Sequence, residues 1–396
     1  MRLPTPCYPL AQLLERQFPA LRPAQRRGLA LWVYGAVLAH SACEAAVITA
    51  CEGLSSYATL RQYLREWLRD GGSKRRPCQT ELSVSACFQP LFCWLLQLWQ
   101  GRELMLAIDV TTHQDRLTAV VVSVVYRSRA VPVAWHILPG NRPGAFLPPL
   151  LTLLTTLAPA VPQGQRVVVL SDRGLWSPRL YRHLRQLHWH PLMRVQGDVR
   201  VYLGPRRHCA AASLTPQMAQ AWVGRAVVHK NRPHRLWLTV VVVWTPGHVE
   251  PWVLFTDLPP RVVGVLWYGL RMWIEGSFRD LKSFGWEWER TRRQDPTRVA
   301  RHWLVLAVAS VWVLAAGTAA EDGPPATVGP PARTGQRPVS VFQLGRARLL
   351  NSWLGHCPPP VLRLRPERWP SAPPALQITY HTPLPRHLWA DAYLPI

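Results

Sequence analysis

Three acidic residues occupy positions from which their carboxylates can act together in chemistry. Asp109 ends an apolar run that begins at Leu104, and Asp172 ends a second, β-branched run that begins at Arg166. Glu275 lies within a segment that has helical spacing of apolar residues. Carboxylate oxygens are the ligands that Mg²⁺ prefers, and two-metal phosphoryl transfer needs acids that converge from several elements. The sequence therefore predicts a metal site formed by Asp109, Asp172 and Glu275.

Each of these acids also has a structural alternative. Asp109 could cap a turn after its strand, and Asp172 could be the N-cap of the helix that follows it. Glu275 could be a solvated charge that pairs with Arg271 or Arg279 at helical spacing. For all three acids to be structural, their common arrangement on strands and a helix would have to be a coincidence.

The segment that contains Glu275 carries a further pattern of polar residues. We expect one helix over about 262–284, which contains Tyr268, Arg271, Glu275 and Lys282. At about 100° per residue these four side chains fall within about 60° of one another on the helical wheel. A face with one acid, two cations and a phenol suits a metal ligand beside a phosphate backbone. The pattern predicts that this face contacts DNA through Tyr268, Arg271 and Lys282.

The spacing of the four residues, Y-x2-R-x3-E-x6-K, is similar to the YREK signature of insertion-sequence DDE transposases of the IS-four group. The segments AIDVTTHQ around Asp109 and LSDRGLWSPRLYRHL around Asp172 resemble the first and second acidic motifs of that family. The segment LFTDLP at 254–259 resembles the one that the family carries before its glutamate helix. The resemblance covers roughly residues 100–320, and the YREK spacing is its specific part.

This resemblance implies a DNA transposase whose three catalytic acids bind two Mg²⁺ ions, with Mn²⁺ as an alternative. One ion would activate water or the freed 3′-hydroxyl, and the other would stabilise the leaving oxygen. Arg271 and Lys282 would hold phosphates, and Tyr268 would position the DNA end. The implied partners are double-stranded DNA, as transposon ends and as target, and a second copy of the chain in a dimeric synaptic complex.

Two other functions are consistent with the same residues. A decayed or domesticated transposase would bind DNA without cleaving it, although all three acids and the YREK residues are present. A ribonuclease-H-like repair nuclease would cleave without strand transfer, and it leaves the YREK spacing unexplained.

The order of the predicted elements indicates an α/β fold in which strands bring the acids together. The resemblance implies a ribonuclease-H-like catalytic core, a mixed sheet flanked by helices, over residues 101–320, with a β-rich insertion at about 197–257. An all-helical N-terminal domain at 1–100 would bind the transposon end, and a Pro-rich tail at 321–396 would be largely irregular, with one short helix at 337–353. The core elements that we expect are strands at 104–109, 117–126, 130–138, 166–172 and 191–196, and helices at 147–157 and 177–189.

Composition agrees with a nucleic-acid partner. The 396 residues include 46 Lys and Arg but 22 Asp and Glu, which gives a net charge of +24. A protein this basic usually binds a polyanion. The eight cysteines form no CxxC motif or regular framework, and the first residues have no signal-peptide pattern, so we expect reduced thiols and a cytoplasmic, DNA-associated protein.

Two segments near the end of the predicted core have alternative explanations. The uncharged stretch 303–320 is long enough for a membrane span, but its small residues favour a helix buried against a sheet, and we expect no membrane partner. The segment 286–301 interleaves two tryptophans with five arginines. It is either a surface that tracks DNA or a solvated loop with packed tryptophans.

Overall fold

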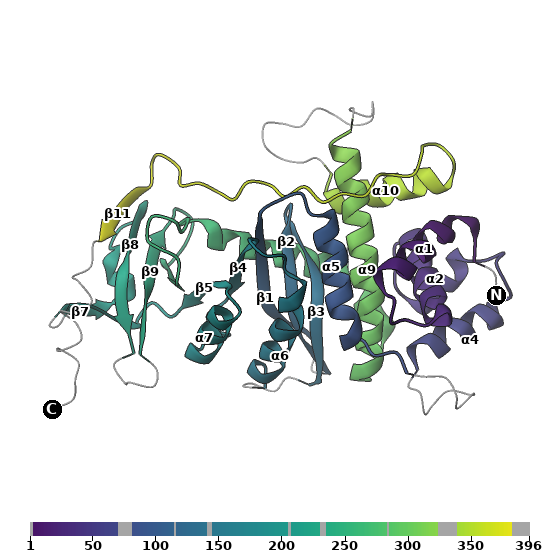
Figure 1. The fold of residues 1–396 in the computed structure, drawn as a ribbon, viewed down its shortest axis with the longest axis horizontal. Coiled ribbons are helices and arrows are strands. Elements are labelled where there is room, and N and C mark those ends of the chain that lie inside the picture. Colours follow the sequence, from purple (N-terminus) through teal and green to yellow (C-terminus); the bar gives the residue numbers. More distant parts are fainter. Residues whose placement is uncertain are drawn as a thin grey trace.

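The computed structural model places one large mixed sheet at the centre of the molecule (Figure 1). It describes residues 3–69, 81–114, 116–140, 145–204, 207–229, 235–282, 285–323 and 339–381. The strands are β1 (Glu103–His113), β2 (Leu117–Tyr126), β3 (Arg129–Pro139), β4 (Arg166–Ser171), β5 (His190–Val195), β6 (Arg200–Gly204), β7 (Arg207–Ala210), β8 (Gln220–Val228), β9 (Leu236–Trp244), β10 (Trp252–Thr256) and β11 (Gln377–His381).

The helices cover both faces of the sheet and one of its ends. Two of them, α6 and α7, connect core strands, and α8 follows a 3₁₀ segment, η7 (Trp267–Met272). The helices are α1 (Tyr8–Gln17), α2 (Pro23–Ala39), α3 (Glu44–Ala50), α4 (Tyr57–Leu68), α5 (Phe88–Leu98), α6 (Leu147–Leu157), α7 (Pro178–Gln186), α8 (Trp273–Leu281), α9 (Pro296–Glu321) and α10 (Val341–Trp353).

The first five strands form the predicted ribonuclease-H-like core. Their spatial order is β3-β2-β1-β4-β5. Strands β1, β2 and β3 pair antiparallel, and β4 and β5 continue parallel to β1. Parallel neighbours need a crossover, and α6 and α7 provide it before β4 and β5. The fold class is therefore the α/β class that the sequence predicts.

The β-rich insertion extends this sheet instead of forming a sheet of its own. Strand β10 pairs antiparallel with β5, with Val253 opposite Val195, and β9, β8, β6 and β7 follow outward. Strand β8 pairs over nine positions with β9, which contains a run of β-branched residues, and this gives the extension its own buried surface. Figure 1 shows this extension at the end of the molecule opposite the N-terminal helices.

Side-chain alternation divides the core strands between two apolar layers. On β1, Leu104, Leu106 and Ile108 face the layer that contains α5, α6, α7 and α9. Met105 and Ala107 face the opposite layer, which contains η7 and α8. Because successive residues of a strand point to opposite faces, Asp109 belongs to the η7 face, as do the even-numbered residues of β4.

The long apolar segment 303–320 lies within α9, which is buried between the sheet and the N-terminal helices. Helices α1 to α4 lie at one end, α5 lies on the sheet, and α9 runs between them (Figure 1). Within the described residues α9 is the one helix long and apolar enough to cross a membrane, and 89% of its apolar window is buried inside the protein. The structure therefore agrees with the predicted buried helix, which is apolar on all sides because protein surrounds it.

The C-terminal tail is more ordered than the sequence predicts. Helix α10 agrees with the expected short helix and packs on α9. The chain then runs extended across the molecule, where Leu364 exchanges backbone hydrogen bonds with Leu98 and Gln100, and ends in β11, parallel to β8 (Figure 1). We call the extended segment between α10 and β11, residues 354–376, the strap. Its Pro-rich composition did not indicate this path, because its backbone hydrogen bonds are made to partners that are distant in the sequence.

Candidate active site

Asp109 and Asp172 lie beside each other on neighbouring parallel strands. The β1–β4 ladder ends with Ile108 opposite Ser171. The next residue after each of these is an aspartate, Asp109 after Ile108 and Asp172 after Ser171. Both acids follow the alternation toward the η7 face. One detail differs from the sequence prediction: Asp109 lies inside β1, because this strand continues to His113 by pairing with β2 beyond the end of β4.

The structural alternatives for the two aspartates are not what the structure contains. Asp109 pairs with Val121 within the sheet and caps no turn. The N-cap of α7 is Ser177, whose hydroxyl accepts a hydrogen bond from the Leu180 amide at 3.0 Å, with Pro178 at the first helical position as expected. Asp172 accepts a bond from the Leu175 amide at 3.1 Å and keeps its other oxygen free of that turn.

Arg271, from the last turn of η7, joins the two carboxylates. Its Nη2 donates to Oδ2 of Asp109 at 2.8 Å and lies 3.7 Å from Oδ2 of Asp172. The side chains of Arg271 and Asp109 are each 12% exposed, whereas that of Asp172 is 37% exposed. The pair of acids is therefore a half-open anionic site that one cation bridges.

Burial sets the protonation behaviour of the site. Burial raises the pKa of Asp109 to about 6, although the Arg271 guanidinium and the Val110 amide oppose this rise, and the charge of Asp172 adds to it. Burial also raises the pKa of Tyr268 to about 12. A second carboxylate and low exposure both disfavour an isolated charge on Asp109, so the site favours a bound cation.

The YREK residues do not lie on the one continuous α-helix that the sequence predicts. The expected helix changes from 3₁₀ to α geometry between Met272 and Trp273, and Lys282 is the C-cap of α8. Angles of 100° per residue therefore do not apply across the whole segment. Tyr268 is buried and its ring packs edge-on against Trp252, with centroids 5.2 Å apart.

Glu275 and Lys282 make no hydrogen bond or ion pair with Asp109 or Asp172 in the described part of the chain. Glu275 is exposed on the first turn of α8, and no hydrogen bond or ion pair joins it to another described residue. The Lys282 ammonium donates to the Thr112 carbonyl at 3.3 Å, on the same strand as Asp109. The structure thus brings Arg271 to both aspartates and brings Lys282 to the continuation of β1.

The donor set fits a divalent ion that is held partly by the protein. Among the described residues no three His, Cys, Asp or Glu side chains converge as a complete metal site. Mg²⁺ commonly takes one or two carboxylates and completes its shell with water and substrate phosphates. Asp109 and Asp172 supply two such carboxylates, and their oxygens already converge on one cation, Arg271.

Three residues near the site were missed at the level of sequence. Arg173 directly follows Asp172, and its guanidinium is 3.1 Å from Glu250. Arg194 of β5 is 2.8 Å from the same glutamate, and its charge acts on the pKa of Tyr268. Arg173 could have been identified from its position next to Asp172, but the pairing through Glu250 depends on how the insertion adds to the sheet.

The segment after α8 is mainly structural. Trp286 and Trp288 are buried, and Trp286 donates to the Ser310 hydroxyl at 3.0 Å. Arg301 is fully buried and donates to the Leu68 carbonyl at 2.8 Å. Of the two alternatives for this segment, packed tryptophans agree with the burial of Trp286 and Trp288, and Arg301 is equally unable to form a surface that tracks DNA because it is buried within the protein.

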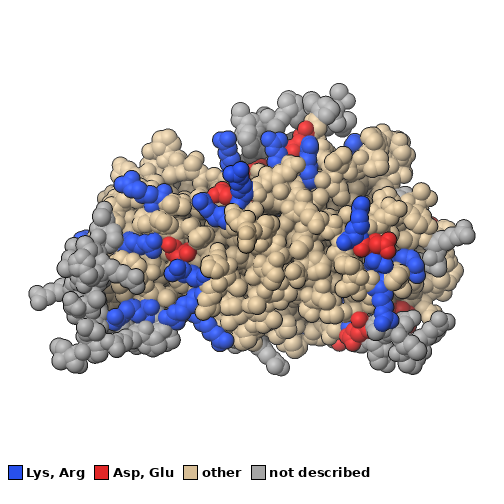
Figure 2. Space-filling model, in the orientation of Figure 1, with Lys and Arg blue, Asp and Glu red and all other residues tan. Residues whose placement is uncertain are grey.

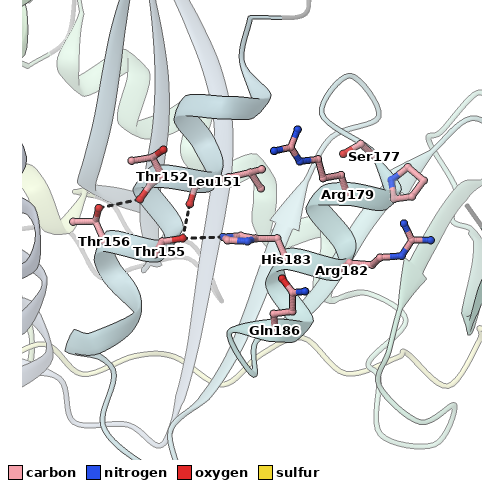
Figure 3. A pocket seen from close by; sticks show the side chains of 10 residues that line it. Leu151, Thr152, Thr155, Thr156, Ser177, Arg179, Arg182, His183 and Gln186 are labelled. Atoms are coloured by element: carbon pink, nitrogen blue, oxygen red, sulfur yellow. Dashed lines mark hydrogen bonds between the residues drawn. The ribbon is translucent and has the colours of Figure 1, made fainter. Parts of the chain in front are cut away.

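A wide groove lies between α6 and α7, away from the carboxylate pair. It measures about 1000 Å³, and none of the predicted site residues lines it. Figure 3 shows Arg179 and Arg182 along α7 and the hydrogen bond of 3.1 Å between His183 and Thr155 across the groove. Its lining contains no acid, so it differs from the carboxylate site in charge.

The sheet order and its flanking helices define a ribonuclease-H-like fold. The family described as Transposase DDE domain matches residues 97–312, more than half of the chain, and the chain belongs to this family. Family membership supports a function in DNA transposition, and DDE transposases generally use divalent metal ions.

Similarity to individual proteins is low. No curated protein sequence matches the chain. One solved structure, the cryo-EM structure of the piggyBac transposase synaptic complex with hairpin DNA, is similar with a TM-score of 0.40 and 10% sequence identity, over 86% of this chain and 75% of that chain.

Proposed function

We propose that this chain is a metal-dependent transposase of the IS-four group that cleaves DNA at transposon ends and transfers the strands to target DNA. The observation that carries the proposal is the adjacency of Asp109 and Asp172 on one sheet face with Arg271 bridging them. Asp109 and Asp172 are the proposed ligands of Mg²⁺ or Mn²⁺, and Glu275 is the third ligand that the YREK resemblance implies.

The proposed roles of the protein groups follow from their charge and burial. A bound divalent ion would supply charge stabilisation at the scissile phosphate and a more acidic water. Asp109, fixed in the middle of the sheet, holds its carboxylate in a set position without reorganisation. Arg271 offers a cation for phosphate oxygens beside the two aspartates, and Lys282 offers a second one further along β1.

The proposed partners are double-stranded DNA and a second copy of the chain. Two transposon ends must be held together while they are cut and transferred to target DNA, which a dimeric synaptic complex achieves. We expect purified protein to be brought together by end DNA, so the mass of the complex should correspond to two chains and two ends. A complex that keeps one chain per DNA at saturating concentrations would contradict the dimer.

A second candidate function is DNA binding without catalysis. The exposed position of Glu275, without a contact to either aspartate, favours this alternative. The two functions differ in one measurement, which is Mg²⁺-dependent nicking of DNA that contains the flanking ends of the gene.

The test of catalysis compares carboxylate variants on this DNA. Asp109→Asn, Asp172→Asn and Glu275→Gln should each reduce nicking at least about 100-fold, because loss of a ligand removes transition-state stabilisation. DNA affinity should change little. Asp198→Asn, in the exposed turn between β5 and β6, is the control and should cleave normally.

The outcomes separate the two functions residue by residue. Near-normal nicking in one variant removes that residue from the active site. If the unmodified protein binds the ends but nicks nothing with Mg²⁺ or Mn²⁺, the non-catalytic alternative is correct.

A further inference from the structure

Arg271 is held differently from Arg301 and Arg127, the two buried arginines among the described residues. The buried Arg301 engages all three guanidinium nitrogens, through the Leu82 and Leu68 carbonyls and the Glu81 carboxylate. Arg127 likewise uses three nitrogens. Such arginines are fixed parts of the core, because each donor has its own acceptor.

Among the residues that the structure describes, the guanidinium of Arg271 pairs with the two aspartates and with no other acid. One nitrogen, Nη2, makes both contacts, at 2.8 Å to Asp109 and 3.7 Å to Asp172. Its Nε is buried and has no hydrogen-bond partner among the described residues. An unpaired buried donor costs free energy, so this arrangement is not the best satisfied state of the side chain.

The position of Nη2 is also informative. It contacts Oδ2 of both aspartates, whereas their Oδ1 atoms accept hydrogen bonds from the Val110 and Leu175 amides. Two adjacent carboxylates repel each other, and a cation between them relieves this repulsion. A guanidinium and a divalent ion cannot occupy that place at the same time.

We infer that Arg271 is an exchangeable counter-cation of the Asp109–Asp172 pair, which leaves the carboxylates when a divalent ion binds and then becomes available to a DNA phosphate. This inference rests on the proposed function, because it takes the two aspartates as metal ligands. The inference couples metal binding to DNA binding. A metal ion at the aspartates frees Arg271 to bind DNA, and DNA that binds Arg271 leaves the aspartates open to the metal ion. Such coupling is reciprocal by thermodynamic linkage.

The first experiment measures Mn²⁺ binding to the DNA-free protein by calorimetry. Arg271→Gln should bind Mn²⁺ at least about fivefold more tightly than the unmodified chain, because the competing cation is gone. Arg173→Gln removes a positive charge next to Asp172 without removing a contact to it, and its Mn²⁺ affinity should change less than that of Arg271→Gln. Arg271→Lys keeps the charge on a shorter side chain, so its Mn²⁺ affinity should lie between those of the unmodified chain and Arg271→Gln.

The second experiment measures affinity for a pre-cleaved DNA end with and without Mg²⁺. In the unmodified chain Mg²⁺ should tighten DNA binding by about fivefold or more, and Arg271→Gln should lose this effect. Arg279→Gln, an exposed arginine on α8 that contacts neither aspartate, should retain the full Mg²⁺ effect.

The results distinguish failure of the inference from failure of the proposed function. If Asp109→Asn binds Mn²⁺ as well as the unmodified chain, the aspartates are not the metal site and the proposed function is wrong in that respect. If Asp109→Asn loses Mn²⁺ while Arg271→Gln and Arg271→Lys bind it like the unmodified chain, the exchange is overturned. If Arg173→Gln tightens Mn²⁺ as much as Arg271→Gln, only general charge matters, and the exchange is again overturned.

Discussion

At the residue scale, Tyr268 shows how burial limits what a motif residue can do. The sequence predicts that this phenol positions DNA. Its side chain is buried, and its ring packs against Trp252 of β10, which belongs to the insertion. The hydroxyl is close enough to the two aspartates, Arg194 and Arg271 for their charges to act on its pKa. Tyr268 therefore contributes to the packing beneath the carboxylate site.

Substitution of Tyr268 separates packing from hydrogen bonding. Tyr268→Phe keeps the ring and should change the free energy of unfolding by less than about 1 kcal/mol. Tyr268→Ala leaves a cavity beside Trp252 and should cost about 3–5 kcal/mol in chemical denaturation. If Tyr268→Phe alone reduces affinity for DNA ends severalfold at unchanged stability, the hydroxyl contacts DNA directly, as the motif predicts.

A second acid on α8, Asp280, is buried, whereas Glu275 on the same helix is exposed. Its carboxylate pairs with Arg129 at the start of β3. Burial raises the pKa of Asp280 to about 6, and the Arg129 guanidinium limits this rise. In the unfolded chain the same carboxyl titrates at its ordinary pKa of 3.8. Between these values the folded protein binds more protons than the unfolded chain, so this group makes stability fall as pH rises.

The expected effect of Asp280 on pH dependence has a definite sign. Relative to Asp280→Asn, the unmodified chain should lose up to about 3 kcal/mol of stability between pH 4 and pH 7. Urea denaturation of both proteins across this range measures the difference, in which contributions of other acids such as Asp109 cancel. A difference that stays constant or grows with pH would show that the pKa of Asp280 is not raised. Asp198→Asn is the control for an exposed acid.

At the element scale, α9 and α10 approach each other through two glycines. A Cβ atom at Gly345 would overlap the carbonyl oxygen of Val313, and one at Gly317 would overlap the carbonyl oxygen of Val341. The contacted atoms are backbone and cannot rotate away. Any side chain at either position must therefore push the two helices apart.

This close approach predicts an unusual sign for a glycine-to-alanine change. Alanine normally favours a helix by about 1 kcal/mol over glycine. Gly345→Ala should nevertheless destabilise the protein by about 1–3 kcal/mol, because overpacking outweighs propensity. Thermal unfolding measures the change, with Asn351→Ala on the exposed face of α10 as the control. A stabilised Gly345→Ala variant would show that α10 is not packed on α9 in this way.

At the scale of the whole molecule, the excess of positive charge is spread unevenly. Figure 2 shows Lys and Arg side chains gathered toward the two ends and along the top of this face, with a largely uncharged centre. Several arginines are neutralised within the protein, and Glu44 alone pairs with Arg61, Arg65 and Arg293. The net charge of +24 therefore overstates the number of cations that can face DNA.

Salt dependence counts the cations that do contact DNA. The affinity for DNA ends should fall linearly on a plot of log K against log salt, by about 0.9 per phosphate contact. Lys282→Gln should reduce the slope by about 1 and Arg279→Gln should leave it unchanged. A flat plot for the unmodified chain would mean that the charge is compositional and forms no DNA interface.

The sequence by itself determined the local features on which the site depends. Apolar runs defined the five core strands, and their termini identified Asp109 and Asp172. The Ser177-Pro178 pair identified the start of α7, and the small-residue composition of 303–320 identified a buried helix. These features were predictable because alternation, capping and hydrophobicity act within a few residues of the chain.

Only the tertiary structure decided which distant residues meet. The register of β1 and β4 places Asp109 beside Asp172, and η7 brings Arg271 to both. The change from 3₁₀ to α geometry in the YREK segment, the addition of β10 to β5 and the strap to β11 were likewise not predicted. Strand partners and helix crossings depend on surfaces that form only when remote segments pack together. A local sequence pattern does not identify the segment against which it will pack.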